Sequence, residues 1–205
     1  VDSLPITGLS ETDFEVLEDG RRQLPIAVKE LVATHGKLSV ALLLDRSGSI
    51  REELDDVKEA AKSFVKLLDD SSQACVISFS TTVVLEQSFT TSKRKLNGAI
   101  DRIVSGGRTS LFDAVVTGAT QLQEVDGHRV IIVLSDGRDR SSTNTLEEAL
   151  ERVVPLNIPV YAIGLGLASD EGEKELKAFT AATAGTYLAS PTSDELESTF
   201  RALLR

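Results

Sequence analysis

The chain alternates between short apolar runs and longer stretches in which apolar residues return every three or four positions. The first pattern is typical of buried strands and the second of amphipathic helices. Apolar strands that alternate with helices predict a mostly parallel, doubly wound α/β sheet with helices on both faces. The runs expected to form strands are residues 38–44, 74–79, 82–85, 129–134, 158–165 and 186–189.

The stretches with helical periodicity each present one apolar face. Between residues 51 and 68, for example, Leu54, Val57 and Ala61 fall on one side of a helix. The link between the second and third apolar runs is too short for a crossover helix, so these runs are expected to form a hairpin with one antiparallel edge strand. The expected helices occupy residues 51–68, 92–104, 111–124, 145–154, 171–183 and 192–204, the last opened by the capping box Thr192–Glu195.

Residues 1–36 carry a different pattern. Apolar residues alternate on both sides of Asp19-Gly20 in the stretch FEVLEDGRRQLPIAV. This dipeptide is a strong hairpin signal because both central turn residues need a positive φ. Pro25 indicates that the second arm is an edge or irregular strand. We therefore expect a short β-rich lead-in segment over residues 1–36, too small to fold alone, followed by one α/β domain over residues 37–205.

Composition narrows the class of partner. The formal net charge of −10 argues against a nucleic-acid backbone or an anionic membrane as the main partner. No apolar run approaches the roughly 18 residues of a membrane-spanning helix. Cys75 is the only cysteine, so no internal disulfide is possible, and its apolar surroundings predict a core residue. A chain that begins at Val1 and contains no methionine is expected to be processed or excised from a longer one.

Oxygen-bearing side chains follow the predicted strands at three separate places. Asp45, Ser47 and Ser49 stand at alternate positions after the first strand of the domain, so an extended loop can point them the same way. Asp136 follows the run VIIVLS, and Thr109 lies in the glycine-rich stretch SGGRTSLFDA before a helix. In sheets of this kind, ligands bind beyond the carboxyl ends of the strands, near the point where strand order reverses.

Two carboxylates and three hydroxyls make a set of hard oxygen donors. Such donors suit Mg²⁺, Mn²⁺ or Ca²⁺ and suit zinc poorly, since zinc prefers Cys or His. If Asp45 binds directly and Asp136 acts through water, one negative charge faces two positive charges. The ion then remains electrophilic, and an incoming carboxylate would complete both its charge and its coordination.

Each of these residues also has a purely structural interpretation. Ser49 with Glu52 forms a plain capping box, and Ser110 with Asp113 has the same spacing. Asp136 could shape a turn with Gly137, and the Thr109 hydroxyl could bond to the backbone. The coincidence of three separate oxygen-bearing segments favours the metal site.

The motifs DRSGSI, GGRTSLFDA and VIIVLSDGR stand in the order of the metal-ion-dependent adhesion site of the von Willebrand factor type A domain, and residues 37–205 resemble that family. The resemblance implies a six-stranded, largely parallel sheet with one antiparallel edge strand. It also implies Mg²⁺ or Mn²⁺ held by Asp45, Ser47, Ser49, Thr109 and Asp136, while the oxygen donors by themselves leave Ca²⁺ open as well. The lead-in segment resembles that of bacterial members. Ala184 departs from the family, because a second glycine often stands there.

The resemblance implies a module that binds a partner protein through an acidic group placed on the metal. We expect no enzyme activity, no nucleic-acid partner, and an exported or cell-envelope location rather than a cytoplasmic one. Two alternatives remain open. One is a metal-dependent hydrolase or phosphotransferase, which the absence of a second Asp in D-x-S-x-S and of a phosphate-binding GxxxxGK[ST] loop disfavours. The other is a scaffold that binds nothing through the motif. The loop with Arg138, Asp139 and Arg140 is either a specificity element or ordinary surface.

Overall fold

A computed structural model describes residues 15, 17–18, 21–22, 37–164 and 170–189. The chain divides into two compact units, Val1–His35 and Gly36–Arg205. In the first unit, β1 (Leu17–Glu18) pairs antiparallel with β2 (Arg21–Arg22), with Glu18 opposite Arg21. This pairing confirms the hairpin expected around residues 19–20, while the boundaries of the lead-in segment stay a prediction.

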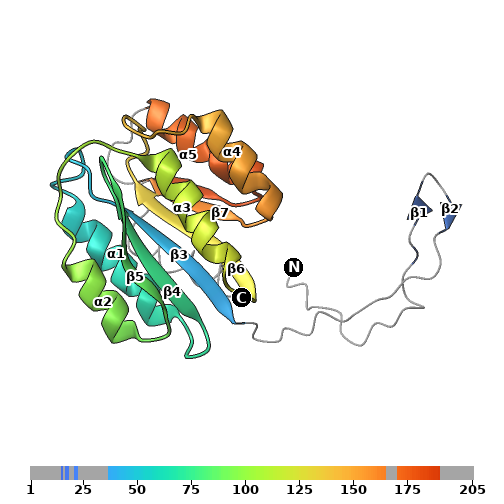
Figure 1. Cartoon of the computed structure of the whole chain (residues 1–205), viewed down its shortest axis with the longest axis horizontal. Helices are drawn as coiled ribbons and strands as arrows, with labels where there is room; N and C mark the ends of the chain where they lie inside the picture. The colour runs from blue at the N-terminus through green and yellow to red at the C-terminus, as the bar shows by residue number, and fades with distance from the viewer. Residues whose placement is uncertain (1–14, 16, 19–20, 23–36, 165–169, 190–205) are drawn as a thin grey trace, which may run out of the picture. The chain divides into compact units, whose positions relative to one another are not determined.

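The second unit is built on a six-stranded sheet (Figure 1). Its strand order is β5-β4-β3-β6-β7-β8. All neighbouring strands run parallel except the edge pair β4 and β5, which is antiparallel. The fold class predicted from the hydrophobic pattern is therefore confirmed. The strands are β3 (Leu38–Asp45), β4 (Gln73–Phe79), β5 (Val83–Thr90), β6 (His128–Ser135), β7 (Val160–Gly164) and β8 (Tyr187–Ala189).

Five α-helices among the described residues cover the two faces of this sheet (Figure 1). Helices α1 and α2 pack on one face and bury Val40, Leu42 and Leu44 of the central strand. Helices α3, α4 and α5 pack on the other face and bury Ala41 and Leu43. Side chains alternate between faces along a strand, so the continuous apolar run of β3 serves both cores. The helices are α1 (Leu54–Leu67), α2 (Lys93–Asp101), α3 (Leu111–Gln123), α4 (Leu146–Val153) and α5 (Asp170–Ala182).

Two elements differ from the sequence prediction. Strand β5 extends to Thr90, well beyond the apolar run 82–85, because an edge strand with partly exposed side chains has no need of a continuous apolar sequence. Helix α1 begins at Leu54 rather than residue 51, since residues 49–53 form a turn before it. The helix predicted over 192–204 lies outside the described residues. None of the described helices is long and apolar enough to cross a membrane.

Candidate metal centre

The predicted ligands lie at the carboxyl edge of the sheet, at the centre of the strand order. Asp45 is the last residue of β3, and Asp136 directly follows β6. These two strands are parallel neighbours, with Leu44 in register with Leu134. The chain leaves β3 toward β4 on one side and later returns to place β6 on the other, so strand order reverses between them. This is where ligands bind in open α/β sheets.

Asp45 is a fully buried carboxylate, with no exposed surface. Its Oδ1 accepts a hydrogen bond of 2.8 Å from the backbone N–H of Ser47, and its Oδ2 accepts one of 2.5 Å from the Ser135 hydroxyl. Burial raises the pKa of Asp45 from 3.8 to about 6, against the lowering effect of these bonds. The negative charge of Asp136 raises it further. A nearby cation would lower the pKa of Asp45 again, because an opposite charge favours the charged form.

The two serines of the first loop present their hydroxyls to each other. The Oγ atoms of Ser47 and Ser49 lie 3.0 Å apart within hydrogen-bond distance. Ser47 is buried and Ser49 is exposed, so the pair leads from the buried carboxylate of Asp45 toward solvent. The capping interpretation of Ser49 is wrong, because the N-cap of α1 is Glu53, without a side-chain cap.

The segment that carries Thr109 is fastened to the first loop by backbone hydrogen bonds. Gly48 N–H donates to the carbonyl of Gly107 at 2.9 Å, and Gly106 N–H donates to that of Arg46 at 2.8 Å. Thr109 is only 2% exposed. Its carbonyl accepts from the backbone N–H groups of Arg140 and Ser141 in the loop after β6, and no described residue forms a hydrogen bond with its hydroxyl. The loops meet here, although the Thr109 side chain forms no hydrogen bond with the other four predicted ligands.

Asp136 supplies an unsatisfied oxygen. Its Oδ1 is buried and accepts no hydrogen bond from the described part of the chain. It lies near enough to Asp45 for the two carboxylates to repel. A buried polar atom without a partner is costly, and a like charge beside it adds to that cost. Neither aspartate forms an ion pair with a described Lys or Arg. No described cation therefore stands at ion-pair distance from either carboxylate.

The donor set fits a hard divalent cation rather than zinc. No three His, Cys, Asp or Glu side chains gather in a metal-binding group within residues 37–164 and 170–189 or the described part of the hairpin. Any ion at this edge must therefore draw on hydroxyls as well as on Asp45 and Asp136. Hydroxyl and carboxylate oxygens are ligands for Mg²⁺, Mn²⁺ or Ca²⁺.

Sequence reasoning missed the role of Ser135 and assigned Asp139 a different one. The Ser135 hydroxyl donates to Asp45 and accepts 2.9 Å from the backbone N–H of Gly137, so it orients the carboxylate and shapes the turn. Its place directly before Asp136, at the end of a buried strand, was the available signal. The carboxylate of Asp139, expected on the surface or in a partner contact, instead accepts from the backbone N–H of Phe112 and the Ser142 hydroxyl. It thereby fixes its loop to the start of α3.

Comparison with known proteins gives the family and the fold. The chain matches no curated protein. It is similar to the solved von Willebrand factor type A protein from Catenulispora acidiphila, with 21% identity and a TM-score of 0.69 over 82% of this chain and 42% of that one. The conserved hypothetical protein BatB from Bacteroides thetaiotaomicron is 18% identical, with a TM-score of 0.68 over 82% of this chain and 95% of that one. The PilB minor pilin from Streptococcus sanguinis is 14% identical, with a TM-score of 0.63 over 82% of this chain and 60% of that one.

The chain thus spans less than half of the Catenulispora acidiphila protein but nearly all of the Bacteroides thetaiotaomicron one. At identities this low, the structural similarity shows a shared fold alone. The sequence match is more specific, because the family of the von Willebrand factor type A domain covers residues 39–202. The chain belongs to the von Willebrand factor type A domain family.

Proposed function

We propose that this chain is a non-enzymatic interaction module that binds an acidic group of a partner protein through a divalent cation. The observation that carries the proposal is the buried Oδ1 of Asp136, which has no hydrogen-bond partner among the described residues and lies near the buried carboxylate of Asp45. Two adjacent carboxylates without a counter-charge are stabilised by a cation between them.

Asp45, Ser47, Ser49, Thr109 and Asp136 would hold the ion. Mg²⁺ is the preferred candidate, with Mn²⁺ or Ca²⁺ as alternatives that accept the same oxygen donors. When bound, the ion supplies a positive charge that the two aspartates only partly neutralise, since hydroxyls carry no charge. Ser135 holds the Asp45 carboxylate in place for this role, and the exposed residue Ser49 lies on the side open to a partner.

The similar structures support an adhesive or assembly role outside the cytoplasm. They include the minor pilin from Streptococcus sanguinis and the type V pili tip protein Mfa5 from Porphyromonas gingivalis. They also include an aerotolerance-related membrane protein from Bacteroides fragilis. By analogy with these folds we propose an extracytoplasmic location and a protein partner for this chain.

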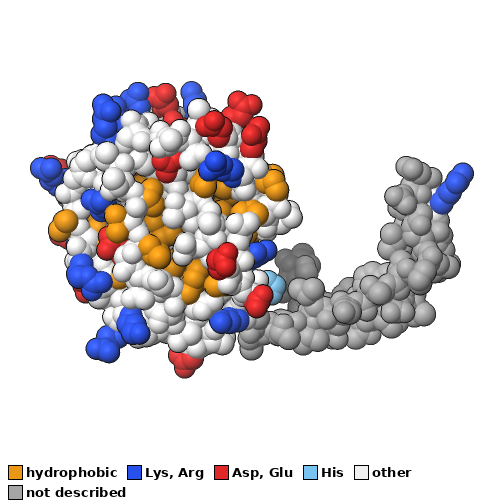
Figure 2. Space-filling model, viewed as in Figure 1, with side chains coloured by type: hydrophobic (Ala, Val, Ile, Leu, Met, Phe, Trp, Pro, Cys, Tyr) orange, Lys and Arg blue, Asp and Glu red, His pale blue; other side chains and the backbone are white. Residues whose placement is uncertain are grey.

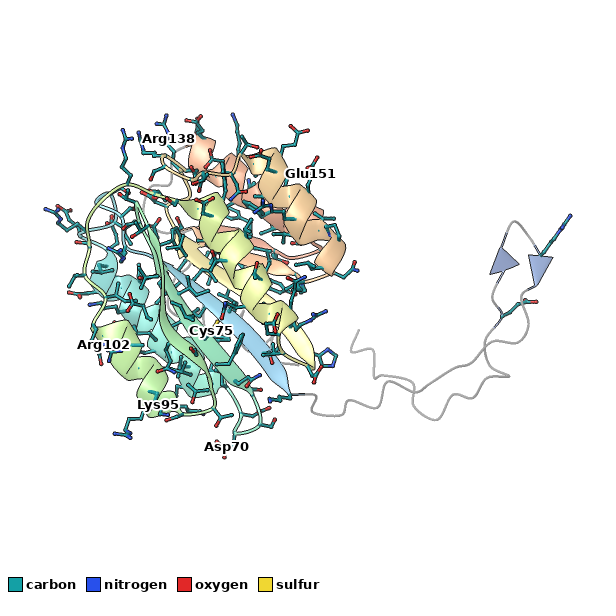
Figure 3. All side chains as sticks on the ribbon, viewed as in Figure 1. Asp70, Cys75, Lys95, Arg102, Arg138 and Glu151 are labelled. Carbon is teal, nitrogen blue, oxygen red and sulfur yellow. The ribbon has the colours of Figure 1, made fainter. Side chains whose placement is uncertain are left out.

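Thermal melting with Mg²⁺ and with a chelator tests the ion site. Mass action predicts that Mg²⁺ raises the melting temperature of the native protein. At a Mg²⁺ concentration 100 times the dissociation constant, the free energy of unfolding should rise by about 2.7 kcal/mol. Asp45→Asn should abolish this rise. Asp70→Asn is the matched control, because Asp70 is exposed at the opposite edge of the sheet (Figure 3).

Carboxylate binding is tested on the same proteins. A fluorescent peptide with one glutamate among glycines and serines should bind in Mg²⁺, lose its binding in chelator, and bind Asp70→Asn but not Asp45→Asn. If Mg²⁺ shifts the melting temperature of neither the native protein nor Asp70→Asn, the motif serves only as turns and the proposed function is wrong.

A further inference from the structure

Each segment that carries predicted ligands also carries an exposed arginine. Arg51 follows Ser49 by two residues, Arg108 directly precedes Thr109, and Arg140 belongs to the loop that begins at Asp136. We call these three residues the arginine collar. No lysine occurs in residues 45–53, 105–110 or 135–145. The positive charge beside the predicted ligands is therefore carried by guanidinium groups alone.

Backbone hydrogen bonds bring the collar segments together. Arg140 N–H donates to the carbonyl of Thr109 at 2.8 Å, which places the backbones of Arg140 and Arg108 side by side. Arg108 N–H donates to the Thr81 hydroxyl at 2.9 Å, and the preceding Gly107 accepts from Gly48 in the first loop. The three arginines are thus attached to one fastened set of loops rather than scattered over the domain. Figure 2 shows Lys and Arg side chains, together with acidic ones, along the top of the α/β domain in this view.

The collar arginines differ from the other two arginines of these loops. Arg46 donates from Nε to the Ser78 hydroxyl at 3.2 Å, and Arg138 forms an ion pair of 2.9 Å with Glu171. The collar residues are exposed, and none makes a side-chain hydrogen bond or an ion pair with another described residue. Their charges are available to a partner, whereas those of Arg46 and Arg138 are used inside the fold.

The acids of the same loops do not cancel the collar. Asp45 and Asp136 are the predicted ligands, and the Asp139 carboxylate is engaged by the start of α3. Glu52 and Glu53, beside Arg51, are the remaining acids of these loops, so the three arginines still outnumber them. Guanidinium groups pair with carboxylates through two parallel hydrogen bonds, which makes arginine well suited to this recognition.

We propose that the arginine collar selects a partner protein whose binding segment carries several acidic residues. One carboxylate would reach the ion and its neighbours would pair with Arg51, Arg108 and Arg140. This inference rests on the proposed function for its central contact and adds the class of the partner. An acidic protein segment fits better than a long polyanion such as a nucleic acid. The positive charge is confined to the three collar residues, while the net charge of the chain, −10, would repel the rest of a long polyanion.

Two peptides of equal length test the collar by fluorescence anisotropy in Mg²⁺. One contains six consecutive glutamates, and the other contains one glutamate among glycines and serines. The six-glutamate peptide should bind the native protein more tightly, with a preference that weakens as salt is raised. Each exposed ion pair is worth roughly 0.2–1 kcal/mol, so each of Arg51→Gln, Arg108→Gln and Arg140→Gln should weaken six-glutamate binding by up to about fivefold. The triple variant should lose most of the preference.

Arg129→Gln is the matched control. Arg129 lies near the amino end of β6, six residues before the end of the strand, or roughly 20 Å from the site at about 3.3 Å per residue. It removes the same charge and should leave the preference unchanged. Circular dichroism and melting temperature should show all variants folded, since the collar side chains make no hydrogen bond within the described structure.

The outcomes separate this inference from the proposed function. If the single-glutamate peptide binds only in Mg²⁺ and the triple variant keeps the full preference, the collar proposal is overturned while the metal proposal stands. If the preference depends on the arginines but persists in chelator, the collar is supported and the metal-mediated contact is contradicted. Undetectable binding of the six-glutamate peptide overturns the collar. Tighter binding of heparin or single-stranded DNA of equal charge overturns the assignment of a protein partner.

Discussion

Replacing Asp45 by asparagine should stabilise the ion-free protein at pH 8, although it removes the residue on which the proposed site depends. Asparagine nearly matches aspartate in shape: its oxygen can still accept from the Ser47 N–H, and its amide N–H can donate to the Ser135 hydroxyl, which donates to Asp45 in the native protein. It carries no charge, however, and so avoids the cost of burying a charged group. That cost is what raises the pKa of Asp45 from 3.8 to about 6. Above pH 6, the native protein without an ion holds this carboxylate charged, buried and close to Asp136.

The size of the effect follows from the pKa shift. A shift of about 2 pKa units corresponds to roughly 3 kcal/mol between the charged and neutral states of the buried group. The folded pKa lies above the unfolded pKa, so protonated Asp45 contributes stability that is fully present below about pH 4. This contribution is lost as the pH rises through about 6. Between pH 4 and pH 7, the native protein should therefore lose about 3 kcal/mol that Asp45→Asn retains.

Thermal melts in chelator measure this difference. For a domain of this size, 1 kcal/mol corresponds to about 2–4 °C, so the gap in melting temperature between the two proteins should change by about 6–12 °C across this range. Other groups, such as the half-buried Glu175 whose pKa is also raised by burial, titrate in both proteins and cancel in the comparison. Excess Mg²⁺ at pH 8 should then stabilise the native protein and leave Asp45→Asn unchanged.

Parallel pH profiles for the two proteins in chelator would refute this reasoning. They would mean that Asp45 has an ordinary pKa in the folded state and is therefore solvated or already paired with a positive group. A fall in the stability of Asp45→Asn at pH 8 would contradict the same argument from the other side, since it would show that the ion-free fold depends on the charge.

Two further predictions concern residues away from the site. Ala184 has a φ of +58°, which costs a residue with a side chain roughly 1–2 kcal/mol, so Ala184→Gly should raise the unfolding free energy by about 1 kcal/mol in urea denaturation. The change should be smaller for Asn157→Gly, because asparagine tolerates its φ of +50°, and a destabilised Ala184→Gly would contradict the argument. Burial raises the pKa of Cys75 to about 12, so a maleimide should label the thiol only when the protein unfolds; rapid labelling of the native protein would show that the thiol is exposed.

Much of the fold could be predicted because the two faces of the sheet impose strong patterns on the sequence. The run from Leu38 to Leu44 is apolar without interruption, and in the structure it is buried by helices on both sides. The hairpin of β4 and β5 followed from a link too short for a helix. Strand β5 was predicted too short because its second half, Glu86–Thr90, lies at the sheet edge and lacks the apolar signal.

The residues of the site could be named from the sequence, but their supports could not. Asp45, Ser47 and Ser49 stand at a spacing that an extended loop would align, Asp136 and Thr109 were named from their places after a strand and before a helix, and the family resemblance implied the same five residues. The hydrogen bond from Ser135 to Asp45 joins residues 90 positions apart, and no local pattern reveals such a contact. The same is true of Asp139, whose carboxylate caps a helix from a distant loop.

The most direct test of the account is a crystal structure of the protein grown with Mn²⁺ and acetate, with anomalous scattering used to locate the metal. We predict one anomalous peak within bonding distance of Asp45, Ser47 and Ser49, near Thr109 and Asp136, with an acetate oxygen on its open side. A map without a peak among these side chains, at a Mn²⁺ concentration that saturates ordinary magnesium sites, would contradict the central claim.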